Sequence, residues 1–190
     1  MPLKVGVLIS GRGSNLQALI DACATPNFPA KIVAVLSNKP DAYGLERAKK
    51  ANIPTAIIPH RDYPTREAFD RAMDAKLREM DVEFVCLAGF MRLVTPWFVS
   101  QWREKIINIH PSLLPDFKGA HSHRDALAAG AKIHGCTVHY VTEEMDAGPI
   151  IAQASVPVLA GDTEETLAAR VLEKEHVLYP QALKMIAENK

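Results

Sequence analysis

The sequence has no long hydrophobic run, no excess of either charge and no closely spaced pair of cysteines. No apolar stretch approaches membrane-spanning length, and the apolar run at the N-terminus is too short for a signal peptide. Lys plus Arg and Asp plus Glu number 22 each, so the net charge is zero, which argues against broad binding to nucleic acid or to an anionic membrane. The cysteines Cys23, Cys86 and Cys136 lack C-x-x-C spacing, which favours free thiols in a reducing compartment. We therefore expect a cytoplasmic protein without nucleic-acid or membrane partners.

Several motifs of metal sites and of covalent catalysis are also missing. There is no His-Glu-x-x-His pair and no Cys/His cluster, and helix capping and loop packing explain His121 and His123 well enough, so we expect no metal site. No Gly-x-Ser-x-Gly turn marks a serine nucleophile, and Cys136 lies in a predicted strand without an obvious base. We therefore expect any group transfer to run directly between two bound substrates, without a covalent enzyme intermediate.

The apolar residues that are present fall into short runs typical of buried strands. These runs cover about 5–9, 32–37, 56–58, 83–88 and 106–110. Helical segments lie between them, and this alternation predicts a parallel sheet with right-handed crossovers. Two later runs, 133–141 and 150–156, are joined by a short acidic loop, which predicts an antiparallel pair of strands.

We thus predict an α/β fold with a Rossmann-like, mostly parallel sheet that is flanked by helices and extended by antiparallel strands at its C-terminal side. The length of 190 residues fits a single domain over 1–190. A phosphate-binding half would cover about 1–105, and a half that carries the candidate catalytic residues would cover about 106–190. In the last helix, Pro180 is expected to kink or end the helix.

A glycine-containing loop follows the first predicted strand. Gly11 and Gly13 allow a tight backbone, and Ser14 or Asn15 is the expected cap of the next helix. Backbone N–H groups and the helix dipole at such a turn form a natural cradle for phosphate. The loop is not a dinucleotide fingerprint, because Leu16 stands where the third glycine is needed, and it lacks the Gly-Lys-Ser/Thr ending of a P-loop. A purely structural tight turn is the alternative.

The central candidate for chemistry is the end of the run 106–110. Asn108 and His110 lie on one side of this strand, since strand side chains repeat every two residues. An amide donor beside an imidazole suits a reaction in which an oxygen gains negative charge while a proton moves. Asp146 is the best carboxylate to orient His110, because the Gly-Pro that follows it fixes its loop. Alternatively, Asn108 and His110 simply finish the strand and satisfy loop backbone.

Three loops should meet at the carboxyl edge of the parallel sheet, where such sheets bind their ligands. These are the loops at 11–15, 89–95 and 110–119. The second of them is apolar, so it forms either a lid over the core or the wall of a slot for a flat aromatic ligand.

Five motifs together resemble the folate-dependent formyltransferases. They are Gly11-Arg12-Gly13-Ser14-Asn15-Leu16, Gly89-Phe90-Met91-Arg92, Asn108-Ile109-His110-Pro111-Ser112-Leu113-Leu114-Pro115, Gly135-Cys136-Thr137-Val138-His139 and Asp146-Ala147-Gly148-Pro149. The resemblance covers nearly the whole chain, and the central motif is specific to this superfamily. It implies that the co-substrate 10-formyltetrahydrofolate donates its formyl group to the amine of glycinamide ribonucleotide in purine biosynthesis. It also implies that no metal takes part and that the second half carries the folate loop.

The same resemblance assigns site residues. The catalytic set is Asn108, His110 and Asp146. The ribonucleotide side is Gly13, Ser14, Asn15 and Leu16 for the phosphate and Glu175 for the ribose, although Leu172 and Lys174 stand where polar neighbours are expected. The folate side is Arg66, Met91, Arg92, Leu93, Val94, Asn108, Thr142, Glu143, Glu144, Met145 and Asp146. Thr137 and His139 are expected to support Asp146.

Other functions remain open beside this one. A formyltetrahydrofolate hydrolase uses water in place of the amine, but such relatives carry an N-terminal regulatory domain, whereas this chain starts at its first strand. Relatives that formylate methionyl-tRNA add a C-terminal RNA-binding domain that we do not expect here. A non-catalytic nucleotide-binding module is the third alternative, and the intact Asn108, His110 and Asp146 argue against it. Either a monomer or a homodimer fits the sequence.

Overall fold

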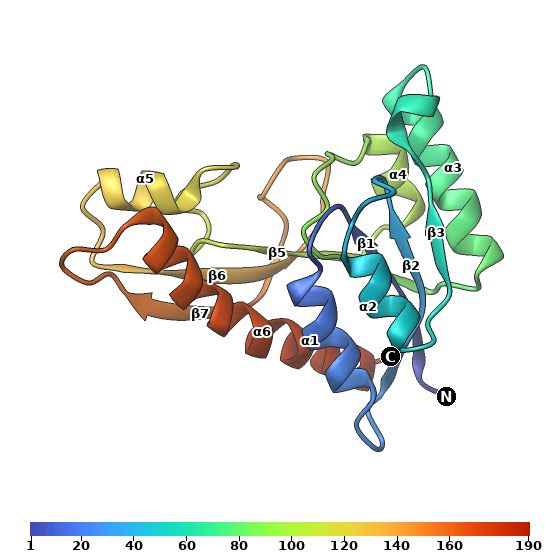
Figure 1. Cartoon of the computed structure of the whole chain (residues 1–190), viewed down its shortest axis with the longest axis horizontal. Coiled ribbons are helices and arrows are strands. Elements are labelled where there is room, and N and C mark those ends of the chain that lie inside the picture. Colours follow the sequence, from blue (N-terminus) through green and yellow to red (C-terminus); the bar gives the residue numbers. More distant parts are fainter.

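A seven-stranded sheet forms the centre of the computed structural model, which describes all 190 residues (Figure 1). The strands are β1 (Leu3–Ile9), β2 (Ala30–Ser37), β3 (Thr55–Ile57), β4 (Phe84–Leu87), β5 (Ile106–His110), β6 (Ile133–Tyr140) and β7 (Ile150–Pro157). Their order in the sheet is β3-β2-β1-β4-β5-β6-β7. The first five strands are parallel, whereas β6 is antiparallel to both β5 and β7. The predicted fold class, with its antiparallel extension, is confirmed.

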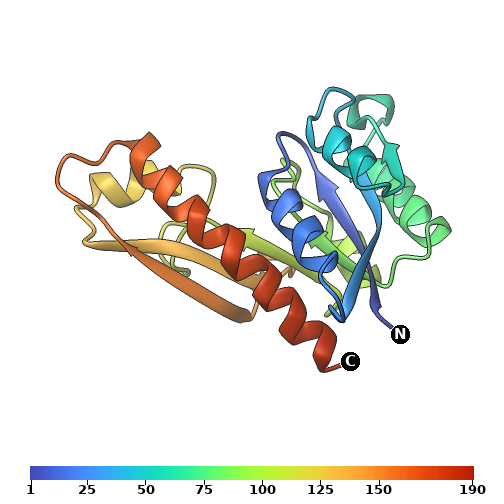
Figure 2. The same cartoon turned by 60° about the horizontal axis from the view of Figure 1, so that its bottom comes forward.

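Helices cover both faces of this sheet. They are α1 (Ser14–Cys23), α2 (Gly44–Lys50), the short 3-10 helix η1 (His60–Asp62), α3 (Arg66–Glu79), α4 (Pro96–Gln101), α5 (Ser122–Ala128) and α6 (Glu164–Glu188). The buried residues of α1, α2 and α6 pack on one face, and those of α3 and α4 pack on the other. The long helix α6 runs beside α1 (Figure 2). None of the helices combines the length and the apolar character needed to cross a membrane.

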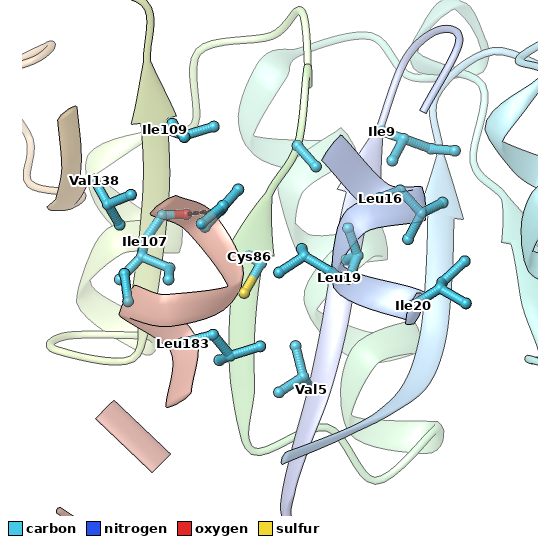
Figure 3. Packing of buried hydrophobic residues seen from close by; sticks show 14 of the residues in the cluster. Val5, Ile9, Leu16, Leu19, Ile20, Cys86, Ile107, Ile109, Val138 and Leu183 are labelled. Atoms are coloured by element: carbon cyan, nitrogen blue, oxygen red, sulfur yellow. Dashed lines mark hydrogen bonds between the residues drawn. The ribbon is translucent and has the colours of Figure 1, made fainter. Parts of the chain in front are cut away.

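The core divides into two clusters because successive strand residues point to opposite faces. In β5, Ile107 belongs to the cluster under α1 and α6, whereas Ile106 belongs to the cluster under α3 and α4. Figure 3 shows the first cluster, in which Ile107 and Cys86 of the sheet lie near Leu183 of α6. Both faces of the central strands are therefore buried, which explains their continuous apolar runs.

Two local predictions are wrong. The cap of α1 is neither Ser14 nor Asn15 but Gly13, whose φ of 75° is left-handed and which makes no side-chain cap. A Cβ on Gly13 would lie 2.7 Å from the Cα of Gly44 in α2, so close helix packing excludes a larger residue there. Of the two outcomes expected at Pro180, a kink or an end of the helix, the end is wrong, because α6 continues to Glu188 with buried residues on both sides of the proline.

Candidate active site

A cavity of about 130 Å³ opens where the loops after β4 and β6 meet the end of β5. Its walls contain most of the residues that were predicted for the folate side. The predicted residues that line it are Arg92, Leu93, Val94, Asn108, Thr142, Glu143, Glu144, Met145 and Asp146. Four further residues line it, which are Leu87, Phe90, His139 and Val141. His139 was predicted only as a support for Asp146, and Phe90 belongs to the apolar loop 89–95. Sequence reasoning missed Leu87 and Val141, whose only signal is their place in apolar runs.

Two predicted folate residues do not line this cavity. The side chain of Met91 is 71% exposed, and only its backbone is held, since its N–H donates to Ser10 Oγ at 2.8 Å. Arg66 is the exposed first residue of α3 and is not among the residues that line the cavity.

His110 is held between two oxygen atoms at the end of β5. Its side chain is 7% exposed, and its Nε2 lies 3.0 Å from the carbonyl oxygen of Phe117. Because a carbonyl can only accept, Nε2 carries a proton and donates it. The other ring nitrogen, Nδ1, lies 3.6 Å from Oδ2 of Asp146. The ring of His110 thus lies between a carbonyl oxygen and a carboxylate.

Asp146 is held by a hydrogen bond from the loop after β5. Its φ of 53° lies in the left-handed region, which is uncommon for a residue other than glycine. The backbone N–H of Gly119 donates to Asp146 Oδ2 at 3.0 Å, which ties the loop after β5 to the loop after β6. The side chain of Asp146 is 9% exposed. The structure thus brings Asp146 to His110 from 36 residues along the chain.

His139 lies on the other side of the Asp146 carboxylate. Its Nδ1–H donates to the carbonyl oxygen of Tyr140 at 2.9 Å, and its Nε2 lies 4.0 Å from Asp146 Oδ1. Burial lowers the pKa of His139, which keeps the ring neutral. In that state Nε2 has no proton to donate and is buried without a partner in the chain. His139 therefore shapes the site around Asp146 without donating a hydrogen bond to it.

Thr137 contacts a different loop from the predicted one. Its hydroxyl donates to the carbonyl oxygen of Ser112 at 2.7 Å and accepts from the N–H of Leu114 at 3.1 Å. Gln153 also donates to this hydroxyl at 3.0 Å. The prediction that Thr137 supports Asp146 is therefore wrong, because its hydrogen bonds hold the segment that follows His110.

The predicted phosphate residues lie at the start of α1. Gly13 and Ser14 leave backbone N–H groups free there, whereas Leu16 is fully buried and its side chain belongs to the core. Asn15 Nδ2 donates to Glu175 Oε1 at 3.1 Å, which joins the loop to α6. Glu175 is only 7% exposed, and burial raises the pKa of its carboxyl group.

A cation that the sequence did not reveal lies beside this loop. Arg47 of α2 donates from Nε to the carbonyl oxygen of Arg12 at 2.7 Å. Together with Ser14, Gln17 and His176 it borders a surface hollow along α1. Leu172 is half-buried and Lys174 is exposed on α6, so neither supplies a buried polar group.

Comparison with known proteins gives one consistent family. The family model described as formyl transferase matches residues 3–183. Over 188 residues the chain is 48% identical to a phosphoribosylglycinamide formyltransferase of Escherichia coli, which covers 99% of this chain and 89% of that protein. Over 185 residues it is 54% identical to the trifunctional purine biosynthetic protein adenosine-3 of Gallus gallus, which covers 97% of this chain. The chain spans only 18% of that longer protein.

Solved structures agree with this result. A phosphoribosylglycinamide formyltransferase from Brucella melitensis is 52% identical, with a TM-score of 0.94 over 98% of this chain and 96% of that one. A glycinamide ribonucleotide transformylase from Symbiobacterium toebii is 48% identical, with a TM-score of 0.97 over 99% of this chain and 89% of that one. The chain therefore belongs to the formyl transferase family.

Proposed function

We propose that the protein transfers the formyl group of 10-formyltetrahydrofolate to the amine of glycinamide ribonucleotide, a step of purine biosynthesis. The observation that carries this proposal is the buried His110, with one nitrogen on the carbonyl oxygen of Phe117 and the other facing Asp146. Asn108 and Asp146 also line the adjoining cavity. The names of the relatives support the same reaction.

In this proposal the two substrates approach from opposite sides. The phosphate binds the N–H groups of Gly13, Ser14 and Asn15 at the start of α1, where the helix dipole favours an anion. The buried carboxylate of Glu175 accepts hydrogen bonds from the ribose hydroxyls. The folate ring enters the cavity between the loop after β4 and residues 142–146. Since about 130 Å³ is small for a ligand pocket, residues 142–146 would move outward to admit it.

The reaction itself needs no enzyme nucleophile. The substrate amine attacks the formyl carbon, and its oxygen gains negative charge as the tetrahedral intermediate forms. Protonated His110 and the amide of Asn108 stabilise this oxyanion. Asp146 holds the positive charge on His110 by opposite charge. The amine then loses a proton, which passes through bound water beside Asp146 to the folate nitrogen as the C–N bond to the folate breaks.

This chemistry requires no metal ion, because His110 and Asn108 supply the charge stabilisation that a Lewis acid would otherwise give. We also infer that the protein acts in the cytoplasm, where both substrates of this biosynthetic step would be available and where its three cysteines remain free thiols.

The test follows folate absorbance during incubation with 10-formyltetrahydrofolate, with and without glycinamide ribonucleotide, in the presence of a chelator. Conversion that requires the ribonucleotide is the expected result. Equal conversion without it would replace the proposal by a hydrolase, in which water takes the place of the amine. No conversion in either tube would leave a non-catalytic binder. His110→Ala is the matched variant, which should fold normally and lose at least about 10²-fold in rate.

A further inference from the structure

The backbone of residues 89–95, here called the folate wall, forms one side of the cavity through Phe90, Arg92, Leu93 and Val94. We propose that Ser10 is a positioning residue that holds the folate wall in its binding conformation and ties it to the phosphate loop. This proposal rests on the proposed function, because it assumes that folate binds in this cavity. Ser10 itself lies outside both substrate sites.

Ser10 lies at the junction of the two sites. It follows the last residue of β1 and precedes Gly11 of the phosphate loop, and it is only 4% exposed. Its hydroxyl oxygen accepts the backbone N–H of Met91 at 2.8 Å, across 81 residues of sequence. The flanking residues Phe90 and Arg92 both line the cavity. One hydrogen bond thus fixes the backbone between two residues that would contact the folate.

The Ser10 hydroxyl is itself oriented by a second buried residue. It donates its proton to Oδ1 of Asn38 at 2.6 Å, and Asn38 is 3% exposed at the end of β2. The amide Nδ2 of Asn38 lies 3.2 Å from Nδ1 of His60 in η1. These bonds fix the direction of the Ser10 hydroxyl. Its proton points at Oδ1 of Asn38, and a lone pair of its oxygen points at the N–H of Met91.

The far end of the folate wall is held independently. The backbone N–H and the hydroxyl of Thr95 both donate to Oδ2 of Asp70, at 2.7 and 2.8 Å. Asp70 is 2% exposed, so this end is firmly anchored to α3. Gly89 turns the chain at the near end with a φ of 70°. Between Gly89 and Thr95, the bond to Ser10 is the side-chain hydrogen bond that restrains the backbone.

Loss of the Ser10 hydroxyl should therefore loosen the near end of the folate wall. The N–H of Met91 and Oδ1 of Asn38 would both lose their partners. We expect folate to bind more weakly because binding must then order this segment, whereas the groups that act on the oxyanion stay in place. The expected signature is a higher KM for 10-formyltetrahydrofolate with kcat nearly unchanged.

The experiment compares Ser10→Ala, Asn38→Ala and the control Ser37→Ala. Ser37 is a matched control because it is 1% exposed and adjoins Asn38, and because its hydroxyl bonds only to the backbone of Lys39. Both KM values and kcat are measured for each variant, and binding of tetrahydrofolate, the reaction product, is measured by calorimetry. For Ser10→Ala we expect the KM and the dissociation constant for folate to rise about tenfold, the size of one lost buried hydrogen bond.

Asn38→Ala should raise the folate KM by a smaller factor, and the double variant should behave like Ser10→Ala, since both residues act through one bond to Met91. Ser10→Cys replaces Ser10→Ala if the latter does not fold. Folate affinity within twofold of wild type in the folded Ser10 variant would overturn the proposal, as would an equal loss in Ser37→Ala or a loss confined to kcat. A wild-type protein without turnover would instead refute the proposed function.

Discussion

Acid should weaken this protein through one buried histidine, His134 of β6. Its side chain is 1% exposed, and its Nε2 lies 3.1 Å from Nδ1 of His123. Its Nδ1 is buried without a partner, and its ring packs edge-on against Phe117 at 6.0 Å. Burial lowers the pKa of His134 from 6.5 to about 4, and the nearby rings of His123 and His110 add to this effect. The folded state therefore keeps this histidine neutral in a range where the unfolded chain protonates it.

The size of the effect follows from linkage. Because the unfolded chain binds the proton more readily, the free energy of unfolding is undiminished above pH 6.5 and falls as the pH drops toward 4. The two pKa values give a loss of about 2 kcal/mol between pH 8 and pH 5. For a chain of this length, that corresponds to a fall of about 4–8 °C in Tm.

His134→Gln should remove this loss, since glutamine does not titrate and its side-chain amide can still donate to His123. We would measure urea unfolding at pH 8 and pH 5 for the wild type, for this variant and for His121→Gln, which replaces an exposed histidine. The drop in unfolding free energy should be smaller in His134→Gln by about 2 kcal/mol and unchanged in His121→Gln. The same drop in all three proteins would refute the assignment to His134.

Three further predictions concern the site and the core. Asp146→Asn should lose at least about 10²-fold in kcat with an unchanged Tm, whereas Glu79→Gln, at the exposed end of α3, should retain full activity. Because burial raises the pKa of Glu175, its ionisation lowers stability as the pH rises above 4.5, so Glu175→Gln should raise the Tm at pH 8 while it raises the KM for the ribonucleotide. Tyr179→Phe removes a buried hydroxyl that donates to two strand carbonyls, at 2.7 and 3.3 Å. It should cost about 1–3 kcal/mol in urea unfolding and leave kcat unchanged.

Most of the fold could be predicted because its strands follow a simple rule. A strand that is buried on both faces must be apolar throughout, so β1, β2, β4 and β5 stand out as runs between turn residues. The cap of α1 could not be predicted in the same way. Ser14 and Asn15 are better caps by residue type. The backbone of Gly44 in α2, however, packs closely against Gly13. That contact joins segments far apart in the sequence, so the sequence pattern does not reveal it.

The site could be predicted where one element carries two of its residues. Asn108 and His110 share β5, so their spacing alone places them on one side of the strand. The hydrogen-bond partner of His110 Nε2 could not be predicted in this way, because it is the backbone carbonyl oxygen of Phe117. A backbone carbonyl has no signature in the sequence, and the φ of 52° at Phe117 is not one that its residue type suggests.

The three buried histidines differ in the groups that face their ring nitrogens. On His134, a second proton at Nδ1 would meet no acceptor, and burial lowers the pKa of this ring and of His139. On His110, both nitrogens face oxygens, one of them a carboxylate. Because His139 is neutral, it places no positive charge beside the Asp146 carboxylate. Of the three, His110 is therefore the ring that we propose for stabilising the oxyanion, beside Asn108 at the end of β5.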